Sequence, residues 1–338
     1  MLENTDKDTS TSSAMRLWID YFYKKENRYS TGFTTFDNAL EGGIEPGTVT
    51  AFSGQPGTGK TALLVQIANT IVNNGNDVIF ISSDMNTAQL FDISYKQELY
   101  RIKKAEDDLS PVSDSRSEKA KSPEEVAEDI VRRCDPHLFI IGKDKWSASI
   151  EEIPGIVEDQ HAFRPVIFLD YLQDFHSDTL PKIVTPKEVV EYAIRMINDL
   201  PSAYDATVIC SCAINRENYN TTMQINAIRD SSQHDYKLEN IVGLQFHGAE
   251  RVGFSYEEAM NVSERNMDLV ILKQRRGPAG IRIQYHFIGK YVTFEEKTGG
   301  DKQPEKISPV SFSDTDEYTE SKLDYLYEGF EDYLWKKN

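Results

Sequence analysis

The residues with the clearest chemical potential form one run, Gly54-Gln55-Pro56-Gly57-Thr58-Gly59-Lys60-Thr61. The run fits the pattern G-x-x-x-x-G-K-[ST], in which glycines let successive backbone N–H groups turn inward around phosphate oxygens. Lys60 would neutralise the β and γ oxygens of a nucleotide, and the Thr61 hydroxyl would bind Mg²⁺. An apolar, β-branched stretch ends at Phe52, and a helical pattern opens at Thr61. The sequence therefore predicts a phosphate-binding loop for ATP and Mg²⁺.

A carboxylate that holds the hydrated metal is expected at the end of a second buried strand. The stretch Val166-Ile167-Phe168-Leu169-Asp170 supplies it. A charge at the end of such a strand is costly unless it has a partner, which favours a metal role for Asp170 beside Thr61. The alternative is a strand-end Asp that caps the next turn.

The elements that must position these residues follow from the apolar pattern. Short apolar runs recur at residues 48–52, 77–81, 138–141, 166–169, 207–212 and 269–272, mostly with helical or charged stretches between them. This is the pattern of a parallel sheet wrapped by crossover helices. Strict alternation at 281–287, followed by a short strand through Phe294, predicts an antiparallel hairpin at the sheet edge. The predicted fold class is α/β, a mostly parallel sheet flanked by helices.

Composition limits the classes of function. The 338 residues carry 37 Lys and Arg against 55 Asp and Glu, a net charge of −18, with 39% hydrophobic residues. A wholly disordered chain is excluded, and contact with nucleic acid must be local because the overall charge repels it. No apolar run approaches the roughly 20 residues that span a bilayer, and residues 1–13 lack an apolar signal core. We therefore expect a cytoplasmic protein that does not bind membranes.

Several further runs are specific in combination: Thr31-Gly32-Phe33-Thr34-Thr35-Phe36-Asp37, Asp170-Tyr171-Leu172-Gln173, Asn215-Arg216-Glu217, Lys273-Gln274-Arg275-Arg276-Gly277-Pro278 and Phe287-Ile288-Gly289-Lys290-Tyr291. With the phosphate loop, they resemble the C-terminal motor domain of DnaB-type replicative DNA helicases across roughly residues 28–296. The resemblance implies a RecA-like ATPase core and a homo-oligomer, a hexameric ring with ATP at the subunit interfaces.

The resemblance also implies roles for two cations. Lys273 and Arg275 would reach the γ-phosphate bound to the neighbouring subunit, with Arg275 as the arginine finger. A planar guanidinium suits the charge spread over a transferring phosphoryl group. The alternative is that both residues belong to a solvated basic turn.

Three positions depart from the family's pattern. Asp84 stands where the family has a Glu that activates water, and its side chain is one methylene shorter, so we expect slower hydrolysis. Ala213 stands where the family has a Gln that senses the γ-phosphate. Gln245 lies near a run that contacts the DNA backbone in the family, and it lacks the positive charge found there.

Two segments are expected to face the pore of such a ring. One follows Gln173 and carries Lys182 and Lys187, and the other runs from residue 217 to residue 250 and carries Arg229 and Lys237. A few inward cations are enough to bind a single strand of DNA without reading its sequence. Solvated surface side chains are the alternative for these lysines.

The chain divides into three predicted parts: an N-terminal linker helix at 1–28, the ATPase domain at 29–296 with a charged insertion at about 101–135, and an acidic tail at 297–338 that ends in an amphipathic helix. Met15, Trp18, Ile19 and Phe22 share one face of the first helix, which needs its own core or a neighbouring subunit. The insertion contains a capping box in which Ser122 precedes Glu125. The family's collar domain is expected to be absent.

Two functions from different classes are compatible with these residues. The first is an ATP-hydrolysing ring motor on single-stranded DNA, a helicase or translocase. The second is a regulatory or scaffold ATPase that assembles as a ring and recruits a partner protein, through the C-terminal helix or the 101–135 insertion, without unwinding DNA. The identities of Asp84, Ala213 and Gln245 favour the second. A recombinase that coats DNA as a filament is disfavoured, because the D-Y-L-Q and K-Q-R-x-G-P runs point to the helicase branch.

Overall fold

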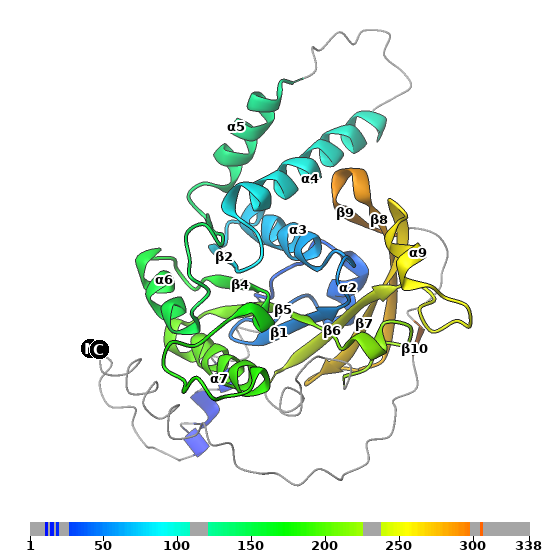
Figure 1. Cartoon of the computed structure of the whole chain (residues 1–338). Helices are drawn as coiled ribbons and strands as arrows, with labels where there is room; N and C mark the ends of the chain where they lie inside the picture. Colours follow the sequence, from blue (N-terminus) through cyan, green and yellow to red (C-terminus); the bar gives the residue numbers. More distant parts are fainter. Residues whose placement is uncertain are drawn as a thin grey trace.

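Ten strands form one sheet in the computed structural model, which describes residues 11–12, 14–16, 18–19, 27–108, 121–225, 238–297 and 305–306. The parallel strands are β1 (Val49–Gly54), β2 (Val78–Ser82), β3 (Leu138–Ile141), β4 (Val166–Asp170), β5 (Thr207–Ala213) and β6 (Asn240–Phe246). The antiparallel strands are β7 (Glu264–Gln274), β8 (Ile281–Ile288), β9 (Thr293–Glu296) and β10 (Glu305–Lys306). The strand order is β10-β8-β7-β6-β1-β5-β4-β2-β3, with β9 paired to β8 (Figure 1).

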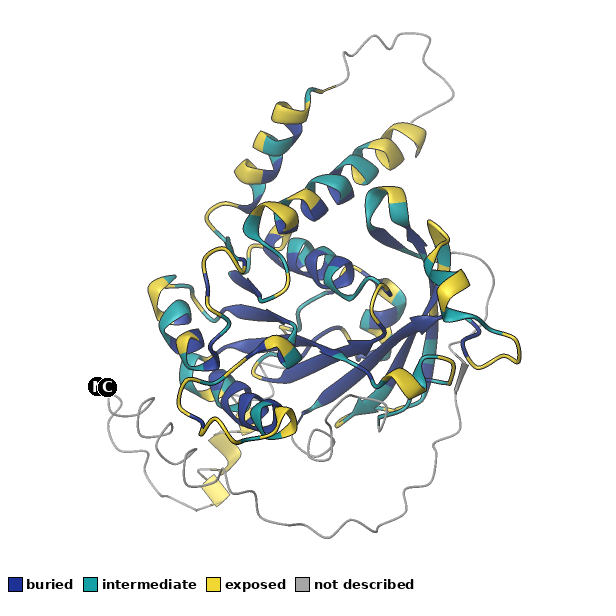
Figure 2. Cartoon of the chain, in the orientation of Figure 1, coloured by how far each residue is buried: buried dark blue, intermediate teal, exposed yellow. Residues whose placement is uncertain are grey.

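Helices cover both faces of the parallel part of the sheet. The helices α2 (Thr34–Ala39), α3 (Lys60–Asn73), α4 (Thr87–Asp108) and α5 (Pro123–Cys134) lie on one side, and α6 (Ile153–Asp159) and α7 (Pro186–Tyr204) lie on the other (Figure 1). Alternate residues of each strand point to opposite faces. Phe168 therefore packs in the core under α3, whereas Ile167 packs in the core under α7. Strands β1, β2 and β4 are buried along their whole length (Figure 2).

The predicted fold class is confirmed, but one inner strand was missed. We expected residues 217–250 to form a single loop that faces a pore, and this was wrong, because β6 occupies residues 240–246 and pairs with both β1 and β7. Gly243 and Gln245 interrupt the apolar pattern of β6, which hides the strand in the sequence. Gln245 is fully buried and its side-chain oxygen accepts a hydrogen bond from the Met223 N–H (2.6 Å), so it cannot touch DNA.

The predicted additions to the core have different outcomes. In the expected N-terminal helix, the described residues 14–16, 18 and 19 are helical, and Met15 and Trp18 are more than half exposed. Residues 307–338, which include the expected C-terminal helix, lie outside the described residues. No helix in the described ranges is long and apolar enough to cross a membrane.

The two ends of the 101–135 segment belong to the packed domain. Residues 101–108 continue α4, and α5 begins after the predicted capping box of Ser122 and Glu125. Val126, Ile130 and Cys134 of α5 are buried in the same core as α3. Residues 109–120 lie outside the described part.

An ionic cluster fastens α5 to α4. The buried carboxylate of Glu98 accepts hydrogen bonds from Arg101 (2.6 Å) and from Arg133 (2.8 Å). Burial alone would raise the pKa of Glu98, but the bonds from the two arginines outweigh it and lower the pKa to about 2. The docking of α5 therefore depends on an ionised Glu98.

Glu98→Gln should destabilise the fold by about 1–3 kcal/mol at pH 7, because the carboxylate that accepts charge-assisted hydrogen bonds from Arg101 and Arg133 is lost. A carboxyl whose pKa is depressed in the folded state stabilises the fold above its unfolded pKa of about 4.3 and loses this effect as the pH falls. The difference in Tm between wild type and Glu98→Gln should therefore shrink from pH 6 down to about pH 2. Glu128→Gln on the exposed side of α5 serves as the control. A constant difference across this range would contradict the ionic docking.

Candidate nucleotide site

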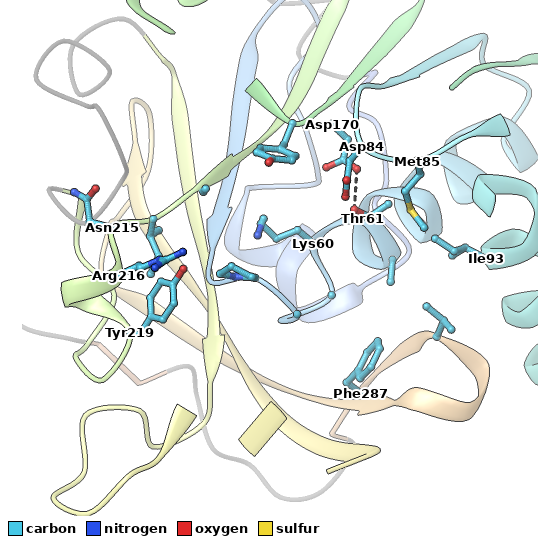
Figure 3. Close-up of a pocket in the computed structure, with 18 residues that line it drawn as sticks. Lys60, Thr61, Asp84, Met85, Ile93, Asp170, Asn215, Arg216, Tyr219 and Phe287 are labelled. Atoms are coloured by element: carbon cyan, nitrogen blue, oxygen red, sulfur yellow. Dashed lines mark hydrogen bonds between the residues drawn. The ribbon is translucent and has the colours of Figure 1, made fainter. Parts of the chain in front are cut away.

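A cavity of 730 Å³ opens where β1, β4 and β5 end (Figure 3). Its polar wall contains Lys60, Thr61, Asp84 and Asp170, and its far side is apolar, with Ile93, Phe287 and Val292. The strands are parallel here, so their carboxyl ends bring residues from distant parts of the sequence to one edge. The size is that of an ordinary small-molecule site.

The phosphate loop forms the floor of this cavity between β1 and α3. Gly57 (φ +73°) and Gly59 (φ +92°) adopt the left-handed conformation that side chains disfavour. Gly59 precedes α3 without a capping side chain, so N–H groups of the first helical turn are available to an anion.

Lys60 begins α3, and its ammonium donates hydrogen bonds to the carbonyl oxygens of Gly54 (2.9 Å) and Gln55 (3.0 Å). Burial lowers the pKa of Lys60, and the negative charge of Asp170 opposes that shift. A desolvated ammonium held by two carbonyls is a strong partner for phosphate oxygens.

Thr61 and Asp170 are brought together from α3 and β4. The Thr61 hydroxyl donates to Asp170 Oδ2 at 2.7 Å, and the Ser211 hydroxyl of β5 donates to Asp170 Oδ1. Burial raises the pKa of Asp170, and the hydrogen bonds from Ser211 and Thr61 and the charge of Lys60 oppose that shift. Adjacent hydroxyl and carboxylate oxygens are the hard ligands that Mg²⁺ prefers, so the residues present fit this metal.

Asp84 lines the same cavity two residues beyond the end of β2. Ser82 pairs with Asp170 across the sheet, and the Ser83 N–H donates to the Asp170 carbonyl (2.8 Å). This local pairing holds the start of the Asp84 turn beside β4. Asp84 is electrostatically close to Lys60 and Asp170, since its charge opposes the lowering of the Lys60 pKa and adds to the raising of the Asp170 pKa.

Lys273 and Arg275 do not reach the phosphate loop of their own chain. Asn240 pairs with both Thr50 and Gln274. The end of β7 therefore lies near the amino-terminal end of β1, whereas Gly54 is the carboxyl-terminal end of that strand. The four residue steps from Thr50 to Gly54 span about 13 Å of strand. Arg275 is largely exposed there, and its guanidinium lies 3.4 Å from Glu239.

The candidate DNA contacts are only partly described. Lys182 lies on an exposed segment next to Ile183, and Lys187 lies in the first turn of α7, 4.0 Å from Glu191. Arg229 and Lys237 lie outside the described residues. The structure does not bring Lys182 or Lys187 into the 730 Å³ cavity.

The model of the DnaB-like helicase C-terminal domain family matches residues 29–296. The chain belongs to this family. In fold it is similar to the isolated ATPase domain of one DnaB-like helicase, with a TM-score of 0.66 and 18% identity over 86% of this chain and 99% of that one. It is also similar to a DnaB-like replicative helicase, with a TM-score of 0.64 and 17% identity over 86% of this chain and 68% of that one.

Curated relatives match only a short segment. The DNA repair protein RadA of Aquifex aeolicus is 38% identical over 71 residues, 21% of this chain and 16% of RadA. The DNA repair and recombination protein RadB of Methanoculleus marisnigri is 36% identical over 67 residues, 20% of this chain and 30% of RadB. The match thus spans about a sixth of RadA and under a third of RadB.

Three side chains at this site were not predicted as site residues from the sequence. Ser211 binds Asp170, Arg216 lines the cavity, and Tyr256 OH donates to the Pro56 carbonyl of the phosphate loop (2.7 Å). Arg216 lies in the run Asn215-Arg216-Glu217, which is typical of the family, and this motif could have indicated Arg216 as a site residue. The roles of Ser211 and Tyr256 depend on which strands and turns become neighbours, and no local pattern reveals that.

Asp170→Asn should raise the Tm by about 2–4 °C at pH 7 without nucleotide or Mg²⁺, because it removes a desolvated charge that lies near Asp84. A carboxyl whose pKa is raised by folding destabilises the fold once it ionises, so the gain should shrink as the pH falls towards 4. Exposed Asp174, changed to Asn, is the control, and differential scanning calorimetry gives the Tm. A lower Tm would mean that the bonds from Thr61 and Ser211 outweigh the cost of burial.

Proposed function

We propose that this chain binds ATP with Mg²⁺ in the 730 Å³ cavity and hydrolyses it as a subunit of a DnaB-type ring motor on single-stranded DNA. The observation that carries the proposal is the separation of two half-sites. One half-site lies at the carboxyl ends of the parallel strands and contains the phosphate loop, Thr61 and Asp170. The other lies at the opposite ends of these strands and contains Lys273 and Arg275. Each half-site then needs a second copy of the chain, which a closed ring supplies.

Within one subunit, the side chains have distinct tasks. The phosphate loop and Lys60 would hold the β- and γ-phosphates, and the apolar wall with Phe287 and Val292 suits the faces of a base. Thr61 and Asp170 would hold Mg²⁺, which neutralises charge on the phosphates when bound. Asp84 would accept the proton of the attacking water, with a reach one methylene shorter than that of Glu.

The neighbouring subunit would supply Arg275 to the terminal phosphate. Its exposed guanidinium has Glu239 as a loose partner at 3.4 Å, so exchanging that partner for phosphate oxygens costs little. Exposed Lys182 and Lys187 are the described candidates for contacts with DNA phosphates.

A second function is favoured by Asp84 and Ala213. The shorter carboxylate and the missing amide at the end of β5 suit a ring that uses ATP mainly for assembly and recruits a partner protein. Such a scaffold would bind ATP but would turn it over slowly and without regard to DNA.

Added single-stranded DNA should raise ATP turnover severalfold, and the rise should fall steeply with salt because phosphate contacts release counterions. Lys60→Ala should reduce turnover by about 100-fold or more, since a charge-assisted contact to the transferring group is lost. Lys143→Ala, a surface lysine outside the cavity, is the matched control. Turnover that ignores DNA in the wild type would reject the motor and favour the scaffold.

Mixing two inactive variants tests the shared site. Lys60→Ala and Arg275→Ala should each be inactive, but a one-to-one mixed ring should recover activity at about one site in four, where both intact residues meet. A mixture of Lys60→Ala with Asp170→Asn is the control, because both changes damage the same half-site and no pairing repairs it. Absence of rescue in mixed rings, verified by mass photometry, would contradict a site shared between subunits.

A further inference from the structure

Arg216 lines the cavity, and the family resemblance assigns no role to this residue. It begins the short 3₁₀ turn Arg216–Asn218 after β5, is exposed, and lines the same cavity as Lys60 and Thr61 (Figure 3). We infer that Arg216 contacts the terminal phosphate of ATP bound to its own chain and so distinguishes ATP from ADP. This inference rests on the proposed function, because it requires ATP in the cavity.

The turn that carries Arg216 is fastened to the phosphate loop. The buried Gln55 side-chain amide donates to the Tyr219 carbonyl at 2.6 Å. The Tyr219 ring packs on the Tyr256 ring with centroids 4.8 Å apart, and Tyr256 OH donates to the Pro56 carbonyl at 2.7 Å. Two contacts thus bind this turn to consecutive residues of the loop. Such support holds a short turn in place, and with it the base of the Arg216 side chain.

The strand before the turn is held as well. Ala213 ends β5 opposite Gly54 of β1, and its N–H donates to the Gln173 side-chain oxygen at 2.9 Å. Strand β5 lies between β1, which leads into the phosphate loop, and β4, which ends at Asp170. Asp170 and Thr61 would hold Mg²⁺, and the segment that leaves β5 lines the same cavity beside them.

The charges in the cavity leave a task for a second cation. Asp84 and Asp170 offset Lys60, whereas a bound triphosphate adds several negative charges. The guanidinium of Arg216 has no carboxylate partner among the described residues, whereas Arg275 and Arg276 each lie against a Glu. An arginine without a carboxylate partner at the edge of a phosphate cavity keeps its donors available for phosphate oxygens.

Ala213 gives this role particular weight. A methyl group at the end of β5 cannot donate a hydrogen bond to the γ-phosphate, as the amide in the family's pattern would. Arg216 lies three residues further along, and its longer side chain carries five donors. Recognition of the terminal phosphate would then move from the strand end to the turn that follows it.

Binding of two nucleotides to Arg216→Gln tests the inference, with a non-hydrolysable ATP analogue and ADP titrated against the full chain by calorimetry in Mg²⁺. The analogue should bind about tenfold or more weakly, whereas the affinity for ADP should change less than about twofold, because only the analogue carries the γ-phosphate. Arg216→Lys should recover part of the loss, since it keeps the charge without the fork geometry. Arg251→Gln, an exposed arginine outside the cavity, is the matched control.

Equal loss for both nucleotides, or no loss for either, would overturn the inference. The Tm of each variant without nucleotide shows whether the fold survives. Failure of the proposed binding of ATP in this cavity has a different result, since the wild type and Arg251→Gln would then bind neither nucleotide.

Discussion

Asp170 ends β4 as a carboxylate with almost no contact with water, and such a group persists only where polar partners surround it. Its partners come from two elements: Thr61 and the nearby ammonium of Lys60 from the start of α3, and Ser211 from β5. The strand order that puts β5 between β1 and β4 brings these groups together. The cost of the buried charge therefore selects a geometry in which hydroxyl and carboxylate oxygens already face one another. That geometry is what a hard divalent cation requires.

The same sheet separates the residues it does not bring together. Strands β6 and β7 run antiparallel, so β7 carries the chain back to the end of the strands that is far from the phosphate loop before it reaches Lys273 and Arg275. A compact domain with a stiff sheet has no route by which Arg275 could fold back across the length of β1. If these cations act on phosphate, they act on another copy. Under the proposed function, catalysis would then depend on assembly, and this link would hold for a motor and for a scaffold alike.

Chemistry that is marked by a motif could be predicted from the sequence, including the meeting of Thr61 with Asp170, whereas contacts that no motif marks could not. The loop from Gly54 to Thr61 was placed correctly between a strand and a helix, because its residue types and flanking patterns are contiguous. Strand β6 was missed, because Gly243 and Gln245 interrupt its apolar pattern and only pairing with β1 and β7 makes it a strand. Gln245 was accordingly assigned to a surface, although it is buried against the Met223 N–H. The roles of Ser211, Tyr256 and Glu98 depend on neighbours distant in sequence, so no pattern at these positions reveals them.

The net charge of −18 is a property of the whole chain and does not determine how the cavity binds phosphate. Over the whole surface the excess of acid repels polyanions, but inside the cavity Lys60, the first turn of α3 and Arg216 supply donors for phosphate oxygens in partly desolvated surroundings. Asp84 and Asp170 balance these cations, so binding of phosphate there depends on where a few fixed donors point and not on an excess of positive charge. The turn of Arg216 is also bonded to the phosphate loop through Gln55 and Tyr219. A displacement of the loop would therefore move the turn of Arg216 with it, so the two cations of the cavity are held on connected pieces of backbone.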